Sequence, residues 1–177
     1  MVVSGVPEGG GYTEDVPEVA EDRRFLVSSR PLVPAEVIAD VEGPGCGAVV
    51  TFLGTVRDHN GGRRVLFLEY EAFAALAVKS FERIADEVTA RWPSARLAIR
   101  HRIGRLQIGE TSVVIAVASA HRGDAFAAAR YAIERIKQIS PIWKHEHFDG
   151  GDVWIEGATA DPADEGARQL ALERACS

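Results

Sequence analysis

"TSVVIAVASAHRGDAFAAARYAIERIKQI", residues 111–139, decides the fold of this chain of 177 residues. Residues 111–120 are apolar on both faces of an extended segment, which is typical of a strand in the centre of a sheet. Residues 123–139 then carry apolar side chains at helical spacing, on a stripe of Phe126, Ala129, Ile133 and Ile136. Asp124 lies in the first turn, where the helix dipole favours a negative charge, and Pro141 ends the helix. The segment therefore predicts a buried strand followed by a long helix.

The rest of the chain alternates between strands and helices. Extended apolar runs predict strands at residues 24–29, 47–56, 65–73, 95–104, 142–148 and 152–157. We expect the second of these to be buried and to form a hairpin with the third, and the last two to form another hairpin. Helical spacing predicts a short helix at 34–42 and a long one at 74–91, with a buried stripe of Leu76, Phe81, Ile84 and Val88. The pattern predicts an α+β fold with a mainly antiparallel sheet and two long helices.

Both ends of the chain lie outside this pattern. Residues 1–24 are rich in Gly, Pro and acids, so we expect a disordered arm. Residues 25–157 form the predicted domain, and residues 158–177 are interpreted as a tail or short helix.

Composition excludes several classes of protein. No apolar run approaches the ~18 residues of a membrane span, and the first residues lack the basic and apolar regions of a secretory signal. We therefore expect a cytoplasmic protein without a membrane partner. The net charge of −6 argues against nucleic acid as a partner. Cys46 and Cys176 lie far apart, which predicts neither a disulfide framework nor a zinc knuckle.

Two of the three lysines flank Pro141 in a chain with 17 arginines. Lys137 lies about 20° from Phe126 around the helix, at the edge of the apolar stripe. Partial withdrawal from water favours a neutral amine there, which can act as a base or nucleophile where Arg cannot. Lys144 is expected on the same side as Ile142 and opposite Trp143. The alternatives are that Lys137 extends its ammonium to solvent and that Lys144 is an ordinary strand-edge lysine.

Basic residues also follow two of the predicted strands. His121, Arg122 and Gly123 lie where the central strand gives way to a helix, and free backbone N–H groups there can bind a phosphate or carboxylate. Arg57 follows another strand and can add a bidentate contact to the same anion. A chance His-Arg pair and a solvated loop arginine are the alternatives.

Histidines offer weak support for a metal. His145 and His147 lie on one face of a predicted strand, which is a real ligand geometry. The sequence has neither HExxH nor a cysteine partner, and the lysines nearby repel cations. We therefore expect no metal and no other cofactor.

Four motifs, in order, resemble the large, catalytic subunit of molybdopterin synthase. They are "GAVVTFLGTVRDHN" (47–60), "HRIGRLQIGE" (101–110), "VASAHRGDAF" (117–126) and "IKQISPIWKHE…DVWIEG" (136–146 and 152–157). The resemblance covers about residues 25–157 and implies a fold of the α/β-hammerhead type. It implies a sulfurtransferase of molybdenum cofactor biosynthesis, which converts cyclic pyranopterin monophosphate (precursor Z) into the dithiolene of molybdopterin.

The resemblance also implies partners. The sulfur comes from a small ubiquitin-like sulfur-carrier subunit whose C-terminal Gly-Gly thiocarboxylate enters the large subunit's pocket. Two large subunits form the homodimer core of a heterotetramer.

Functional residues carry over by position. Lys137 and Lys144 match the family's two essential lysines, and Arg57, His121 and Arg122 match residues of its anionic pocket. The family's terminal segment adds cationic contacts, for which Arg168 and Arg174 are both candidates. A non-catalytic module that binds an anion and a metal-dependent hydrolase are the competing functions. Simple binding would tolerate arginine at the lysine positions, which argues against the first.

Overall fold

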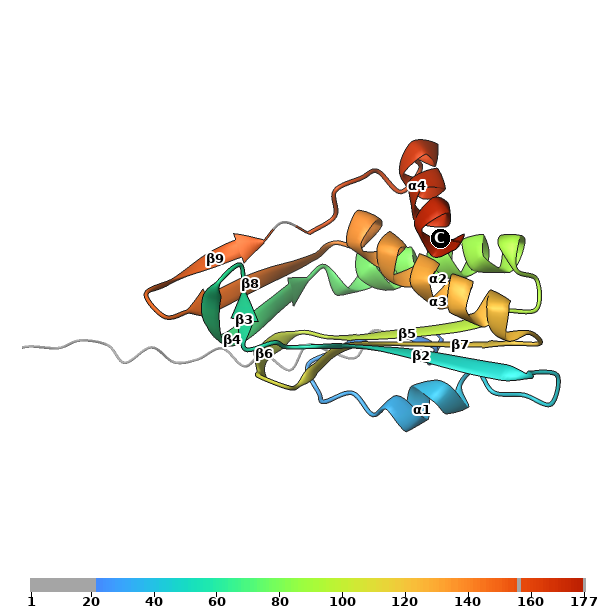
Figure 1. Cartoon of the computed structure of the whole chain (residues 1–177), viewed down its shortest axis with the longest axis horizontal. Helices are drawn as coiled ribbons and strands as arrows, with labels where there is room; N and C mark the ends of the chain where they lie inside the picture. The colour runs from blue at the N-terminus through green and yellow to red at the C-terminus, as the bar shows by residue number, and fades with distance from the viewer. Residues whose placement is uncertain (1–21, 156, 177) are drawn as a thin grey trace, which may run out of the picture.

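A four-stranded sheet with helices on both faces forms the body of the protein. The structure, a computed structural model, describes residues 22–155 and 157–176, so the predicted arm lies mostly outside the described residues. The strand order is β1 (Phe25–Ser28), β5 (Arg96–Arg102), β7 (Thr111–Ser119) and β2 (Ala48–Thr55). Figure 1 shows the long helices α2 (Ala74–Arg91) and α3 (Arg122–Ile139) on one face and the short α1 (Pro34–Ala39) on the other.

The central position predicted for residues 111–120 is confirmed. β7 lies between β5 and β2 and pairs antiparallel with both, and its side chains are buried from Ser112 to Ser119. β1 and β5 are the parallel pair. The prediction that residues 47–56 are buried is wrong, because β2 lies at the edge of this sheet and exposes Val49, Phe52 and Leu53.

A second sheet lies at one end of the first. It runs β3 (His59–Asn60), β4 (Arg63–Ala72), β8 (Ile142–Phe148) and β9 (Gly151–Ile155), with β6 (Gly104–Gln107) on β4. The predicted hairpin of β8 and β9 is confirmed, and Gly150 adopts a positive φ of 93° in its turn.

The predicted pairing of residues 47–56 with 65–73 is wrong. β2 pairs with β7, whereas β4 pairs with β3, β6 and β8. Gly61 and Gly62 both adopt positive φ, so the loop closes its own two-residue hairpin between β3 and β4. The chain thus leaves the first sheet after β2 and starts the second.

The two long helices have the predicted bounds to within one residue, and Phe81, Ile84 and Val88 of the predicted α2 stripe are fully buried. The first residue of each stripe is not, because Leu76 on α2 is 56% exposed and Phe126 on α3 is 64% exposed. The buried face of α3 includes Ala129 and Ile136 of the predicted stripe and adds Ala125, Ala128, Tyr131, Ala132, Arg135, Gln138 and Ile139. Since Lys137 lies on the side of Phe126, it is exposed too, and its expected withdrawal from water is not found in this chain.

A buried polar network joins the helices. Arg135 is fully buried and binds Glu87 of α2 through Nε and Nη2 at 2.9 Å each, and Tyr131 donates to the same carboxylate at 2.7 Å. Burial alone would raise the pKa of Glu87, but hydrogen bonds from Arg135 and Tyr131 hold this pKa below its usual value.

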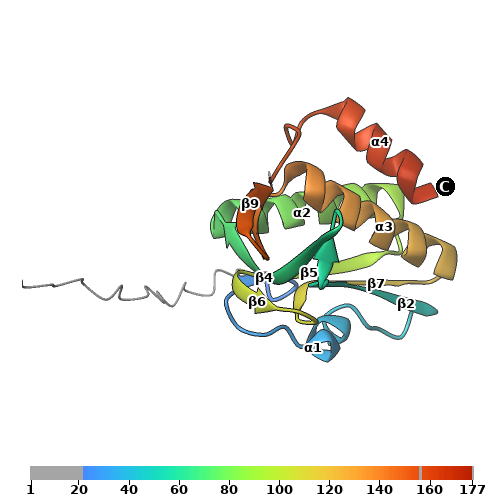
Figure 2. The ribbon, with the colours of Figure 1, turned by 60° about the vertical axis from the view of Figure 1, so that its left-hand side comes forward.

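The terminal segment packs on the helices. Gln138 of α3 donates to the Ala167 carbonyl of α4 (Glu165–Cys176) at 3.0 Å. Figure 2 shows α4 on the far side of α3 from the first sheet. The short helix expected within residues 158–177 is thus present.

α3 passes into β8 through Ser140 and Pro141. The Ser140 hydroxyl lies 2.7 Å from that of Ser80 on α2, and both serines are buried. This hydrogen bond fixes the junction between the helical layer and the second sheet.

Candidate active site

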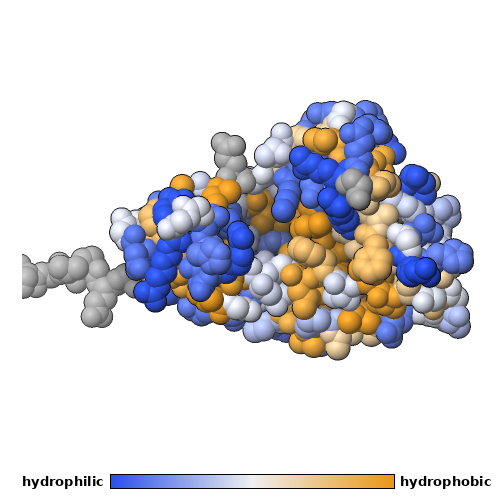
Figure 3. Space-filling model, viewed as in Figure 1, coloured by the Kyte–Doolittle hydropathy of each residue, from blue (hydrophilic) through white to orange (hydrophobic). Residues whose placement is uncertain are grey.

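A cavity of about 740 Å³ lies where the two sheets, the end of α3 and α4 meet. Figure 3 shows a hollow with hydrophobic residues around it between the lobe carrying β8 and β9 and the lobe carrying α4. Apolar side chains from six elements contribute to its wall: Phe52, Val113, Ile136, Ile142, Ile155 and Leu170.

The structure brings both predicted lysines to this cavity. Lys137 lies in the last turn of α3, and Lys144 lies on β8 after Pro141. Lys144 is on the same side of its strand as Ile142, as alternation predicts, since both line the cavity. Six residues separate the two lysines in sequence, but one belongs to the helical layer and the other to the second sheet.

A buried carboxylate accompanies Lys144. The Lys144 Nζ lies 3.5 Å from Oε2 of Glu146, which is only 2% exposed. Asn60 of β3 donates to both oxygens of this carboxylate, at 3.2 and 3.0 Å. Glu146 supplies a countercharge to the ammonium, and Asn60 fixes the orientation of the carboxylate.

Tyr70 and His101 line the same cavity as neutral polar groups. Burial raises the pKa of Tyr70, with a further contribution from the charge of Glu146, against a hydrogen bond with Ser112 that lowers it. Burial lowers the pKa of His101 to about 4, and its Nδ1–H donates to the Arg102 carbonyl at 2.8 Å. The rings meet edge to face at 5.1 Å. This wall therefore offers a phenol and an uncharged imidazole at neutral pH.

The terminal segment contributes a cation to the cavity. Arg174 of α4 lines it and donates to Glu134 of α3 at 2.7 Å. Arg168 instead pairs with Glu165 on its own helix at 3.0 Å and does not line the cavity. Of the two arginines left open by the sequence, Arg174 is the one at the site.

Close backbone packing shapes the wall beyond β9. A Cβ on Gly157 would lie 2.6 Å from the Ile142 carbonyl oxygen, so only glycine fits there without a shift. The next residues are held to α3, because the N–H groups of Thr159 and Ala160 both donate to the Gln138 carbonyl at 2.9 Å.

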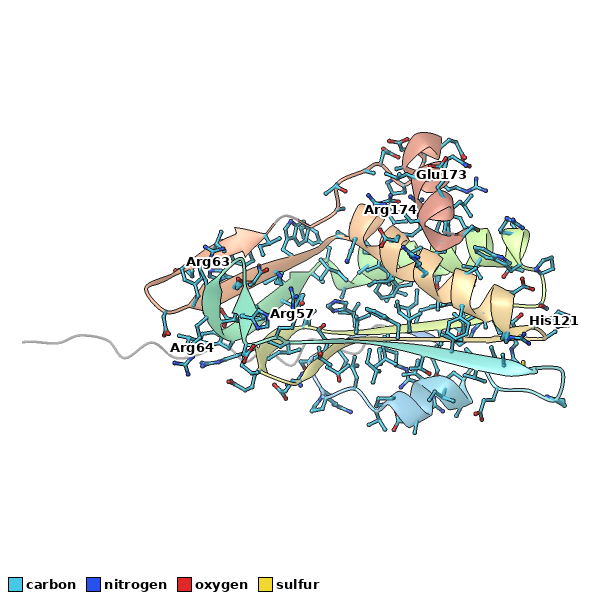
Figure 4. The ribbon with its side chains drawn as sticks, in the orientation of Figure 1. Arg57, Arg63, Arg64, His121, Glu173 and Arg174 are labelled. Carbon is cyan, nitrogen blue, oxygen red and sulfur yellow. The ribbon has the colours of Figure 1, made fainter. Side chains whose placement is uncertain are left out.

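The predicted anion-binding residues do not line this cavity. His121 and Arg122 are exposed at the start of α3, about 22 Å along the helix axis from Lys137. Figure 4 shows His121 at one end of the molecule, well away from Arg57. Arg57 is exposed in the loop after β2, two residues beyond Thr55, which does line the cavity. One chain alone does not bring these three residues to one anion.

Sequence reasoning missed several polar residues of the site. They are Tyr70, His101, Glu134 and Glu146, which come from four different elements. Only alternation along β8 signals Glu146, since it places this residue on the side of Lys144.

The opposite face of the second sheet carries the one group of potential metal ligands found among the described residues. It consists of Glu69, His145 and His147, whose ligand atoms lie within 4.8 Å of one another. Strand alternation puts these side chains on the side away from Lys144. In the described part of the chain, no helix is both long and apolar enough to cross a bilayer.

Comparisons with known proteins agree on one family. Residues 27–139 match the family described as MoaE protein. The molybdopterin synthase catalytic subunit of Halalkalibacterium halodurans is 50% identical over 133 residues, which cover 75% of this chain and 85% of that protein. The Bacillus subtilis protein of the same name is 48% identical over 132 residues, which cover 75% of this chain and 84% of that protein.

Solved structures give the same result. The crystal structure of molybdopterin synthase from Staphylococcus aureus has 41% identity and a TM-score of 0.74, over 77% of this chain and 99% of that chain. A complex of subunits 1 and 2 of molybdopterin-converting factor from Helicobacter pylori has 23% identity and a TM-score of 0.54, over 63% of this chain and 73% of that chain, which is a likeness of fold.

Proposed function

The chain belongs to the MoaE family of molybdopterin synthase catalytic subunits, and from this membership we propose that its 740 Å³ cavity is where sulfur is transferred. It is a sulfurtransferase of molybdenum cofactor biosynthesis. The substrate is cyclic pyranopterin monophosphate, which receives two sulfurs to form the dithiolene of molybdopterin in the cytoplasm. The observation that carries the proposal is the meeting of Lys137 and Lys144 at one cavity.

The sulfur donor is the C-terminal Gly-Gly thiocarboxylate of a small ubiquitin-like subunit. A glycine tail is narrow enough to enter a cavity between two sheets, and its negative charge suits the cations Lys137, Lys144 and Arg174. The apolar side chains of the wall exclude water around the thiocarboxylate, which strengthens its attraction to these cations.

The two lysines have different surroundings, which supports different roles. Lys144 lies beside the buried Glu146, so it binds and polarises the anionic substrate as a fixed cation. Lys137 is exposed at the cavity and has no ion pair among those found in the described residues, so we assign it proton transfer or transient covalent capture of the tail. Attack by sulfur, release of the tail and opening of the cyclic phosphate all require proton transfer.

His121 and Arg122 fit this function through the homodimer. They lie too far from Lys137 to act on the same substrate within one chain. We assign them, with the exposed Arg57, to an anion site that forms when a second copy brings its His121 and Arg122 to this copy's cavity. The homodimer is then the core of a heterotetramer with one small subunit at each cavity.

Reconstitution tests the assignment of the lysines. The purified protein is mixed with precursor Z and the thiocarboxylated small subunit, and molybdopterin is measured for wild type, Lys137→Arg and Lys144→Arg. Arginine keeps the positive charge but does not release a proton at neutral pH, so we expect Lys137→Arg to lose roughly 100-fold or more in rate. Lys144→Arg should weaken substrate binding more than it slows turnover.

Lys79→Arg is the matched control, since Lys79 is exposed on α2 and does not line the cavity. It should leave the rate unchanged. Full activity of both cavity variants would reject the roles assigned to these lysines, and absence of product with wild type would reject the reaction itself.

A further inference from the structure

Glu69, His145 and His147 form a compact cluster on the face of the second sheet that points away from the cavity. The His147 Nε2 lies 2.7 Å from Oε2 of Glu69, and the His145 Nδ1 lies 3.7 Å from the same oxygen. β4 supplies the carboxylate and β8 supplies both imidazoles, and Glu69 lies directly opposite His145 in the ladder. We propose that these three side chains bind a divalent transition-metal ion of the Zn²⁺ type.

The spacing of the three ligand atoms fits a tetrahedral ion. Zinc bonds to nitrogen and oxygen are about 2.0–2.2 Å long, which places neighbouring ligands about 3.3–3.5 Å apart. The two separations in the structure, 2.7 and 3.7 Å, lie on either side of this value, and all three atoms lie within 4.8 Å of one another. Small side-chain rotations therefore suffice to close the site, with water as the fourth ligand.

Asp152 completes the arrangement from β9. Its Oδ2 lies 2.6 Å from the His145 Nε2, the ring nitrogen that does not face Glu69. A carboxylate that accepts the second N–H of a ligating histidine fixes the tautomer and makes the other nitrogen a better donor to metal. The Asp152–His145 pair has this connectivity, so the lone pair of Nδ1 is directed toward the cluster.

Aromatic stacking holds both imidazole rings. His145 stacks on Trp154 with centroids 4.2 Å apart and planes 11° apart, and His147 stacks on Phe67 at 4.2 Å and 18°. Because a ring on β9 and a ring on β4 already restrain the two imidazoles, they lose little further conformational freedom when they bind an ion. The two carboxylates, Glu69 and Asp152, also favour a cation at the cluster. The Arg105 guanidinium lies over the Phe67 ring, 3.7 Å from its centroid.

The position of the site gives the ion a structural role. It would join β4 to β8, the two strands that carry Tyr70 and Lys144 on their opposite face. The ion would not touch the substrate, so this site differs from the metal centre of a hydrolase. It would fix the position of Lys144 relative to Tyr70.

Titration of the tag-free, chelator-treated protein with Zn²⁺, followed by calorimetry, tests the proposal. We expect one ion per chain for wild type, and a loss of affinity of about 100-fold or more in Glu69→Gln and in His147→Ala. Asp152→Asn, at an exposed position, should lower affinity about 10–100-fold because it acts through His145. Titration with Co²⁺ should give the visible absorption of a four-coordinate ion without a thiolate charge-transfer band.

His59→Gln is the matched control. His59 also pairs with a carboxylate, Asp58, at 2.6 Å, but no third ligand accompanies it among the described residues. It should bind Zn²⁺ as wild type does, while circular dichroism confirms that every variant is folded. If wild type does not bind Zn²⁺, these residues form ordinary ion pairs and the proposal is overturned. The same holds if Asp152→Asn and Glu69→Gln both bind Zn²⁺ as tightly as wild type does.

Discussion

At the scale of single residues, the cavity wall combines lysines with the buried His101, whose low pKa affects the stability of the fold. Its ring is 5% exposed and its pKa is about 4, well below the ordinary value of about 6.5. Between these two pH values, His101 is protonated in the unfolded chain and neutral in the folded chain. The free energy of unfolding therefore falls as the pH decreases from 6.5 to 4, and the contribution of His101 is fully present above pH 6.5.

We expect His101 to lower the free energy of unfolding by about 2 kcal/mol when the pH is decreased from 7 to 5. Urea unfolding of wild type and His101→Asn at both pH values measures it, since asparagine does not titrate and can still donate to the Arg102 carbonyl. The loss on acidification should be smaller in the variant by that amount. An equal loss in both proteins would show that His101 does not titrate as a buried group.

The sequence predicted that Lys137 and Lys144 meet, and both line one cavity in the structure. It was wrong about the surroundings of Lys137, which is exposed. On α3 the exposure of Phe126 was not predicted, whereas Ala129 and Ile136 of the predicted stripe are buried. Ala125, Ala128 and Ala132 are fully buried instead, because their small side chains let the helix pack closely on the sheet. Hydropathy does not report this steric preference.

At the scale of elements, the buried pair of Arg135 and Glu87 joins α2 to α3. Removing one partner leaves the other charge buried and unpaired, so Arg135→Ala should lower the free energy of unfolding by about 3–5 kcal/mol. Arg83→Ala is the control, because Arg83 reaches the same carboxylate at 3.4 Å from a 45% exposed position and should cost less than about 1 kcal/mol. Urea unfolding at neutral pH compares them, and similar losses would contradict a buried charge pair.

Elements with strong periodicity and the local hairpin of β8 and β9 were predictable, whereas the pairing of β2 and β4 was not. Local hydrophobic patterns are enough to predict both long helices and β7. β2 pairs with β7, which lies more than 50 residues away in sequence, so no local pattern indicates this pairing. Gly61 and Gly62 close the short hairpin of β3 and β4, whereas the sequence had suggested a hairpin between the longer strands at 47–56 and 65–73. The sequence indicated His145 and His147 as a possible ligand pair but not Glu69, because Glu69 joins them only once β4 and β8 are paired.

At the scale of the whole molecule, one chain carries both halves of the proposed site at opposite ends. Co-expression of Lys137→Arg and Arg122→Ala with two different tags, followed by purification through both, yields only mixed dimers. In each, one cavity combines the intact Lys137 of one copy with the intact Arg122 of the other. We expect about half of wild-type activity from two inactive parents, since a two-fold dimer has two equivalent cavities.

Measuring molybdopterin formed per dimer checks this expectation. A mixed dimer as inactive as its parents would show that His121 and Arg122 do not reach the second copy's cavity. Mixed dimers of wild type with Lys137→Arg, prepared in the same way, set the level for one working cavity.

The junction between α3 and β8 has a mechanical consequence. Only Ser140 and Pro141 connect the helix that carries one amine to the strand that carries the other, and the hydroxyl contact with Ser80 holds that connection in place. A tilt of the β8–β9 arm against the helical layer therefore changes the distance between the amines of Lys137 and Lys144, because no flexible segment lies between α3 and β8 to absorb the movement. If the small subunit proposed above docks on this arm, it can change the distance between the two lysines by tilting the arm.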